Sequence, residues 1–560
     1  MVPSRVYRFL GHLTSMSLNA GRLDEPLGPA LVTTSGRSAD IGDFDDSAIS
    51  TIEALMGDTT VPALCARFSD IVWIRKKNHK GAKLAANAYL EEFKALDKMS
   101  KWTWGITILE RGFGLARILG VKSSQFECYT DFILGRLNGL RDSCDDAYCA
   151  RLLSLLVEHR SGEPEALASI AESIGTRLDQ GGSDFLGRQY YDIAVNCFEW
   201  ARDDESVRRT KRLKGDSLVR CAERCIEKGG QGYSSAVHHL AVGIECLRQG
   251  RDEVERIKRL HKCLLDWQGE ATSEMQTYSH ERDVSNMVEI AQKHVSDKPL
   301  HEAIFAMAMG HNPINTDALR RRVLDQIDEF PLASLFGVTM MASDGRVVAN
   351  KPSVVHVNGE HREAAIEAEM FHQAAQIDWG LRAQAYIDVC RRQIWNEHRP
   401  SYRDLEFLVL QNPFISKGHE GLFLKGIVCG FRGEFDFAAH LLVPQIEESL
   451  RHVLKKAGHI TSKLDAKLIQ QERSLGVLLA MPETVKIFGE NHVFELRGLL
   501  CEKFGCDLRN RLAHGFLTYN ETWGADVLNI WWLVIRFLCI PLCDISTQPG
   551  EETEDFSVET

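Results

Sequence analysis

The chain lacks the motifs and the long apolar runs that define several large protein classes. No Gly-x(4)-Gly-Lys-Ser/Thr loop occurs, so a phosphate-binding loop of the usual form is excluded. No stretch reaches the roughly 20 apolar residues that a membrane-spanning helix needs. The most apolar stretch, 527–543, is interrupted by Asn529, Arg536 and Pro541. We therefore expect no membrane segment and interpret 527–543 as a buried helix.

Cysteine spacing shows neither a zinc motif nor a disulfide framework. The 15 cysteines are scattered over 560 residues, and no Cys-x-x-Cys pair occurs among them. The closest pairs are four or five residues apart and include Cys221 and Cys225, Cys501 and Cys506, and Cys539 and Cys543. With no His or acidic cluster at zinc-ligand spacing, we interpret these as buried helix cysteines. We expect no metal, no cofactor and a reducing, cytoplasmic location.

Positive charge is also scarce. The chain has 66 Lys and Arg against 78 Asp and Glu, a formal net charge of −12. General affinity for nucleic acid comes mainly from Lys and Arg facing phosphates, so the whole chain is a poor candidate for it. The excess is uneven, because residues 401–545 hold 16 basic and 17 acidic side chains. That nearly neutral segment could still bind one short RNA.

Residues 46–330 carry a helical pattern, with apolar residues recurring at steps of three and four. Breakers such as Gln180-Gly181-Gly182-Ser183 divide it into helix pairs of roughly 30–40 residues, which predicts a solenoid-like region. Because no clean repeat consensus is present, an irregular helical bundle is an equal alternative. Residues 1–45 are rich in Gly, Ser, Pro and Thr without a period, and we expect a poorly ordered N-terminus. The first 23 residues carry no acidic side chain, which also resembles a transit peptide.

The pattern changes after residue 330. Two β-rich runs, 335–341 and 347–349, flank Ser343-Asp344-Gly345-Arg346, and an Asp-Gly turn between apolar runs predicts a hairpin. We therefore expect a linker module over residues 331–400, made of a small β-hairpin and helices.

Residues 401–545 predict a bundle of four or five helices with short connections. The expected helices span 435–457, 464–480, 493–504, a short segment near 509 and 523–538. An acidic tail, 546–560, is expected to be disordered. The whole chain is thus predicted to be all-α apart from the small hairpin.

The most informative stretch is Arg509-Asn510-Arg511-Leu512-Ala513-His514-Gly515. It places a fixed cation, an amide and a titratable base on about one and a half helical turns. At about 100° per residue, Asn510 and His514 share a face that Arg509 flanks. Leu508 and Leu512 lie on the opposite face, where a core would hold them. The polar groups are therefore predicted to point outward.

A helical bundle with Arg-x(4–6)-His before or within a late helix resembles the HEPN superfamily, named for higher-eukaryote and prokaryote nucleotide-binding domains. A polar residue usually follows the arginine there, as Asn510 does. The Arg-Asn-x-x-x-His-Gly motif and the upstream run 435–447 are similar to the signature of a poorly characterised family of C-terminal domains in that superfamily. The resemblance covers residues 401–545. Phe516 departs from members that are targets of a partner nucleotidyltransferase, which carry Tyr two residues after the His.

The resemblance implies a metal-independent endoribonuclease, of the kind found in antiphage defence, toxin–antitoxin and RNA-processing settings. A ribose 2′-OH would attack the adjacent phosphate and leave a 2′,3′-cyclic phosphate, which selects RNA over DNA. His514 would be the general base or acid, and Arg509 would stabilise charge on the phosphate. Asn510 would orient His514 or donate to a phosphate oxygen. Arg511 is a weaker candidate, for substrate grip or for a local ion pair.

One motif supplies one histidine, whereas the reaction uses an acid and a base. The resemblance implies a homodimer through the C-terminal bundle that brings two motifs together. RNA is the expected substrate, and the N-terminal helices are candidates for a protein partner. The alternative is a non-catalytic adaptor, or a protein that binds nucleotide or RNA without cutting. In that case Arg509 caps a neighbouring helix and His514-Gly515 ends its own.

Overall fold

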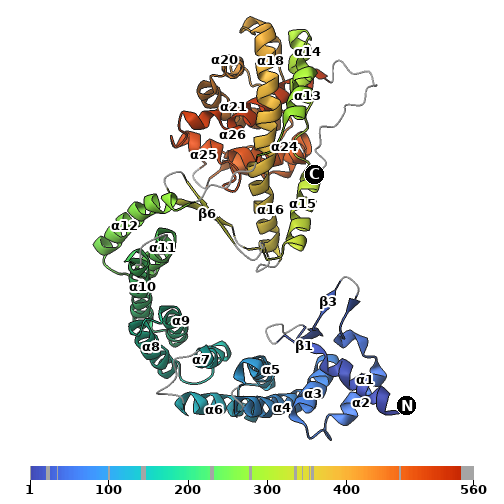
Figure 1. The fold of residues 1–560 in the computed structure, drawn as a ribbon, viewed down its shortest axis with the longest axis vertical. Helices are drawn as coiled ribbons and strands as arrows, with labels where there is room; N and C mark the ends of the chain where they lie inside the picture. The colour runs from blue at the N-terminus through green and yellow to red at the C-terminus, as the bar shows by residue number, and fades with distance from the viewer. Residues whose placement is uncertain are drawn as a thin grey trace. The chain divides into compact units, whose positions relative to one another are not determined.

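The structure is a computed structural model that divides into two compact units, Met1–Met275 and Gln276–Thr560. Both are built mainly of helices with a few two-stranded hairpins (Figure 1), as the all-α prediction requires. The structure describes residues 2–19, 25–33, 36–98, 101–139, 147–227, 232–275, 281–332, 337–342, 345–351, 353–354, 359–465 and 468–543.

The first unit consists of consecutive helices and two short N-terminal hairpins. Its helices are α1 (Val2–Thr14), α2 (Asp46–Leu55), α3 (Pro62–Lys76), α4 (His79–Lys98), α5 (Trp102–Leu119), α6 (Ser124–Gly139), α7 (Ala147–His159), α8 (Pro164–Gln180), α9 (Asp184–Ala201), α10 (Asp204–Glu227), α11 (Tyr233–Gln249) and α12 (Val254–Ser273). Its strands are β1 (Met16–Leu18), β2 (Leu27–Pro29), β3 (Val32–Thr33) and β4 (Gly36–Arg37), paired antiparallel as β1–β2 and β3–β4.

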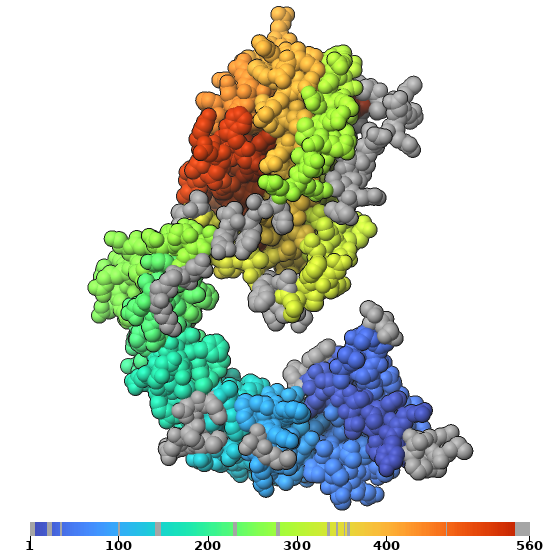
Figure 2. Space-filling model, viewed as in Figure 1, coloured from blue at the N-terminus to red at the C-terminus, as the bar shows by residue number. Residues whose placement is uncertain are grey.

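From α3 to α12, helices pack chiefly against their neighbours in the chain. Figure 2 shows this order as consecutive bands of colour from blue to green along the first unit. Helices α8 and α9 approach so closely at Gly175 and Gly187 that a Cβ on Gly187 would lie 3.0 Å from the Gly175 carbonyl oxygen. Packing between chain neighbours is what a solenoid-like region requires, which is one of the two alternatives that the sequence left open.

The predicted disorder of residues 1–45 is wrong for the part of that segment that the structure describes. Helix α1 and the β1–β2 hairpin form there, and Leu13, Met16 and Leu27 are buried in one cluster with Phe68 and Ile71 of α3. These apolar residues come from a helix end and two short strands. They therefore follow no single period, which is why the pattern was not recognised in the sequence.

The described part of the second unit holds the other helices and two further hairpins. Its helices are α13 (Ser285–Val295), α14 (Leu300–Met309), α15 (Thr316–Glu329), α16 (Glu360–Gln373), α17 (Trp379–Arg382), α18 (Asp388–His398), α19 (Glu406–Val409), α20 (Glu420–Arg432), α21 (Phe435–Lys456), α22 (Leu475–Leu479), α23 (Pro482–Phe488), α24 (Glu490–Leu500), α25 (Leu508–Ala513) and α26 (Ala525–Cys543). Two π-helical segments, Ala374–Asp378 and Ala383–Ile387, join α16, α17 and α18, and short 3₁₀ turns span Arg403–Leu405 and Asn520–Trp523. The strands are β5 (Val338–Met341), β6 (Val347–Lys351), β7 (Ser462–Leu464) and β8 (Gln470–Glu472).

Helix α26 is the centre of this unit and packs against α14, α20, α21 and α24. Among the described residues it is the one helix long and apolar enough to suit a membrane span, but 78% of its apolar window is buried inside the protein. The prediction of a buried core helix is therefore confirmed.

An ion pair is buried beside α26. Arg382 and Glu495 form a two-pronged salt bridge with side chains that are 2% and 0% exposed, and Arg382 also donates to Asn529 at 2.6 Å. The guanidinium lies 4.6 Å from the centre of the Trp532 ring. Burial of both charges costs free energy, which their hydrogen bonds and mutual attraction must offset. The pair therefore fixes how α17, α24 and α26 meet.

Two sequence-based boundaries differ from the structure. Helices α13 to α15 were assigned to the solenoid-like region, but Ile304, Met307 and Val323 are buried in the same core as α26. The helix predicted over 464–480 is instead the β7–β8 hairpin followed by α22, and Leu464 in it is 66% exposed. Apolar residues that match a helical period but face solvent misled the prediction.

The expected linker module, 331–400, is not separate from the C-terminal bundle, because Ile366, Phe371 and Trp379 are buried in the same core as α26. The β5–β6 hairpin forms with antiparallel register, although Ser343 and Asp344 of its expected turn lie outside the described residues. The acidic tail, 546–560, lies outside them as well.

Candidate functional site

The motif lies on α25, a short helix held by one buried side chain. Leu508 is completely buried, and Leu512 packs against the same core from the same side. Asp507, at φ 47°, precedes the helix, and Gly515, at φ +68°, follows it. A left-handed glycine just beyond a helix is a common way to end one. The predicted division into an apolar anchoring face and an outward polar face is therefore confirmed.

Arg509 and Asn510 are joined to each other and to acidic neighbours. The Arg509 guanidinium donates to the Asn510 side-chain oxygen at 3.2 Å, and the Asn510 amide donates to Asp507 at 2.6 Å. Arg509 also lies 3.7 Å from Glu447 of α21, yet its side chain is 42% exposed. The guanidinium is thus oriented while much of it faces solvent.

His514 is exposed at the end of α25. Its ring stacks on Phe516 with centroids 5.7 Å apart, and the Arg346 guanidinium lies 5.2 Å from the Phe516 ring. The backbone N–H of His514 donates to the Asn510 carbonyl oxygen at 3.0 Å, but no side-chain hydrogen bond or ion pair among the described residues joins His514 to Arg509 or Asn510. The structure therefore places the three predicted residues on one short segment without linking the histidine side chain to the other two side chains.

Arg511 has a different environment. It forms two ion pairs of 2.9 Å, with Glu521 and with Asp526, whose side chain is only 9% exposed. Burial raises the pKa of Asp526, and Arg511 opposes that rise. The sequence left two roles for Arg511, gripping the substrate or forming a local ion pair, and the structure shows the ion pair.

Two residues near the motif were not found from the sequence. Glu447 contacts both Arg509 and, at 3.0 Å, Arg451, and Arg346 approaches Phe516 from the β5–β6 hairpin. The Glu447–Arg451 pair itself follows from its i,i+4 spacing. The contacts of Glu447 with Arg509 and of Arg346 with Phe516 join segments about 60 and 170 residues apart in the chain. No local spacing in one sequence predicts such contacts.

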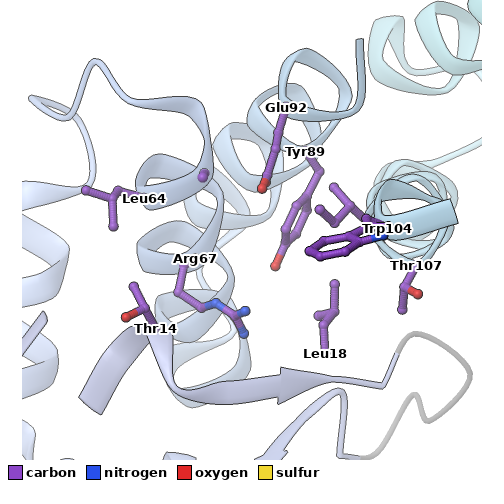
Figure 3. A pocket seen from close by; sticks show the side chains of 10 residues that line it. Thr14, Leu18, Leu64, Arg67, Tyr89, Glu92, Trp104 and Thr107 are labelled. Atoms are coloured by element: carbon purple, nitrogen blue, oxygen red, sulfur yellow. The ribbon is translucent and has the colours of Figure 1, made fainter. Parts of the chain in front are cut away.

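A cavity of about 380 Å³ lies in the first unit (Figure 3). Arg67, Tyr89, Glu92 and Trp104 line it together with Thr14, Leu18, Ala63, Leu64, Thr107 and Ile108. Arg67 carries a buried Nη1 with no hydrogen-bond partner among the described residues. Burial raises the pKa of Glu92, and Arg67 counteracts the rise.

The comparisons with known proteins bear on this part of the chain. Residues 3–127 match a family model described as a domain of unknown function (DUF7380). The matched segment contains the cavity and a buried salt bridge of 2.7 Å between Asp70 and Arg111. It does not include the motif on α25. Neither the curated proteins nor the solved structures yield a match.

Cys221 and Cys225 were interpreted as buried helix cysteines, but both are only partly buried. Their sulfur atoms and a ring nitrogen of His239 all lie within 4.8 Å of one another. A His-His pair 13 residues after the second cysteine was the available signal, and it was not recognised because the spacing fits no common zinc motif.

Proposed function

We propose that the C-terminal unit is a metal-independent endoribonuclease of HEPN type. The observation that carries the proposal is the exposure of Arg509 and His514 on a helix whose opposite face is fixed by the buried Leu508. An exposed imidazole and an oriented, solvent-facing guanidinium are the groups that cleavage by an internal 2′-OH requires.

The proposed chemistry uses no group beyond the protein and the RNA. His514 takes the proton of the ribose 2′-OH, the O2′–P bond forms, and the P–O5′ bond breaks. An imidazolium then gives a proton to the departing O5′, which leaves a 2′,3′-cyclic phosphate and a 5′-hydroxyl. Arg509 pairs with the non-bridging phosphate oxygens, with Asn510 holding its guanidinium. When RNA binds, its phosphate replaces the Glu447 carboxylate as the partner of Arg509.

The second proton-transfer group would come from a second copy of the chain. Exposed aromatic side chains near the motif support a homodimer through this face: Phe516 is 55% exposed, Tyr519 69% and Trp523 45%. Exposed aromatic residues are enriched where proteins associate. In such a dimer two copies of His514 would approach one scissile phosphate as base and acid.

The test is cleavage of labelled single-stranded RNA by the purified full chain in EDTA. We expect wild type to cut, and His514→Ala and Arg509→Ala to lose at least about 100-fold in rate, the usual contribution of one such group. Two matched variants serve as controls. His440→Ala removes another exposed histidine of the same unit, and Arg392→Ala removes an arginine that is 68% exposed.

The controls should cut like wild type. Cleavage that survives His514→Ala would overturn the proposal, as would a requirement for a divalent ion. Loss of cleavage in all four variants alike would also overturn it, because the effect would then not belong to the motif.

One observation favours a second candidate function, a non-catalytic adaptor. Arg509 already contacts Glu447 and Asn510, so its charge has partners in the folded chain. If the motif only fastens α25 to α21, RNA remains uncut while Arg509→Ala lowers stability. The same variants therefore distinguish the two functions when melting temperature is recorded beside cleavage.

A further inference from the structure

Helices α10 and α11 bring three metal-binding side chains together in the first unit. Cys221 and Cys225 are four residues apart and so project from the same face of α10. His239 lies on α11, which packs along α10. The sulfurs and a ring nitrogen lie within 4.8 Å of one another, and all three residues are partly exposed. We propose that these three residues bind one Zn²⁺ ion.

The ligand types and their separation fit zinc. Thiolate and imidazole are its commonest protein ligands, with bonds of about 2.3 Å and about 2.0 Å in a tetrahedron. Such a tetrahedron places ligand atoms roughly 3.5–3.8 Å apart. The three groups reach that separation with rotations of partly exposed side chains. Harder cations such as Mg²⁺ prefer oxygen ligands and are disfavoured here.

Two arginines lie near the cluster. Burial lowers the pKa of His239, and the charge of Arg188 acts in the same direction. Arg224 lies near Cys221 and donates a hydrogen bond to Asp184. Two thiolates with Zn²⁺ are neutral together, so zinc adds no net charge beside the two arginines.

Asp184 supplies an independent observation at the same place. It begins α9, accepts a hydrogen bond from Arg224 through Oδ2, and its charge acts on His239. Its other oxygen, Oδ1, is buried without a hydrogen-bond partner among the described residues. Three protein ligands leave one tetrahedral position open for water. An outer-shell carboxylate is the usual partner of a ligating histidine or of metal-bound water, and Asp184 is placed to be that partner.

A metal at this position would have a structural effect. Helix α10 ends at Glu227 and α11 begins at Tyr233, so the cluster ties together two helices close to their connection. Metal bound only by the folded chain adds its binding free energy to folding. The inference is independent of the proposed ribonuclease, because the cluster and the motif belong to different units of the chain.

The test is metal content and cobalt spectroscopy on the full chain, purified under reducing conditions and supplied with Zn²⁺. We expect about one zinc per chain by elemental analysis. Replacement by Co²⁺ should give the visible and near-ultraviolet absorption bands of tetrahedral thiolate-bound cobalt. Cys221→Ser, Cys225→Ser and His239→Ala should lose the bound zinc and weaken the cobalt bands, and Asp184→Asn should bind zinc about 10–100-fold more weakly.

Two control variants change residues on α11, the helix that carries His239. Cys246→Ser and His238→Ala on α11 change the same residue types outside the cluster and should keep the metal and the spectrum. Circular dichroism of each variant separates loss of metal from loss of fold. The proposal is overturned by substoichiometric zinc together with a featureless cobalt titration in folded wild type. It is also overturned if the control variants lose metal as the cluster variants do, or if mild oxidation merely joins Cys221 to Cys225 with no metal bound beforehand.

Discussion

Three arginines of the second unit differ in burial, and the difference decides what each contributes. Arg382 is 2% exposed and completes a buried ion pair, Arg511 is 28% exposed and bridges two acidic residues, and Arg509 is 42% exposed. An exposed pair contributes little to stability, whereas a buried charge without its partner is costly. Arg509 is therefore the arginine that can bind a ligand at small cost to the fold.

The first prediction concerns Arg511. Replacing it in Arg511→Leu leaves the buried Asp526 without its ion pair, and we expect the free energy of unfolding to fall by about 2–3 kcal/mol. The comparison is Arg509→Ala, which should cost less than about 1 kcal/mol because its pair is half-exposed. Urea denaturation of the two variants measures both values. Equal losses would contradict the distinct roles assigned to the two arginines.

A second prediction concerns pH. Burial, together with the nearby charge of Arg382, lowers the pKa of His311 to about 4. The unfolded chain takes up this proton near pH 6.5, its ordinary value, whereas the folded chain does so only near pH 4. Stability from the neutral ring is thus complete above pH 6.5 and is lost as pH falls toward 4. The loss amounts to at most about 3 kcal/mol.

Urea midpoints measured between pH 7 and pH 4.5 check this. His311→Asn keeps a donor near the position of Nδ1 but does not titrate, so its stability should fall less steeply than that of wild type. His301→Asn, at a histidine that is 63% exposed, should keep the wild-type slope. An unchanged slope in His311→Asn would show that His311 does not carry the effect.

At the scale of elements, the close crossing of α8 and α9 gives a third prediction. A Cβ on Gly187 would lie 3.0 Å from the Gly175 carbonyl oxygen and 3.2 Å from the Asp179 amide nitrogen, both backbone atoms that cannot rotate away. We expect Gly187→Ala to destabilise the protein by about 1–3 kcal/mol even though alanine favours helix. Gly135→Ala on α6, with nothing within 4 Å, should be neutral or stabilising. Thermal unfolding of both variants checks it, and a stabilised Gly187→Ala would contradict the crossing.

The sequence predicted amphipathic helices well, because one face of each is buried and the other is exposed to solvent. Helix α21 was expected over 435–457 and spans Phe435–Lys456, and the two-faced character of α25 followed from the placing of Leu508. The segment 464–480 failed because Leu464 and Leu468 are exposed, at 66% and 78%, so its period marks no buried face. Apolar spacing predicts a helix only where the core uses that spacing.

The candidate site could be predicted only in part, for a related reason. Arg509, Asn510 and His514 are close in sequence and their shared exposure was predictable. The contacts of Glu447 and Arg346 with the motif join distant segments, and so does the approach of His239 to Cys221. Such contacts depend on which helices pack together, and helical periods do not specify that.

At the scale of the whole molecule, each unit has hydrophobic clusters of its own. Helices α13 to α15 belong to the core of the second unit, which moves the boundary from the expected residue 330 to about 275. The family match at 3–127 and the motif at 509–515 thus belong to different units. We therefore expect substitutions in the first unit, at the cavity or the cysteine cluster, to act independently of substitutions at the motif on α25.

The fourth prediction uses that separation. Treating the zinc-loaded chain with a chelator should speed amide hydrogen exchange in α10 and α11 while leaving α21 and α26 unchanged, because the cluster lies in the first unit alone. Exchange measured by mass spectrometry resolves the two sets of peptides. The variant Cys225→Ser should show the faster exchange without chelator. Uniform acceleration across both units would contradict separate stabilisation.

The most direct test of the central claim is end-group analysis of RNA incubated with the full chain, both in EDTA and in metal-free buffer without a chelator. We predict products with a 2′,3′-cyclic phosphate and a 5′-hydroxyl from ordinary RNA, none from the same sequence with 2′-O-methyl riboses, and none with His514→Ala. Cleavage of the 2′-O-methyl RNA, or products ending in a 3′-hydroxyl and a 5′-phosphate, would contradict the assignment of His514 and Arg509.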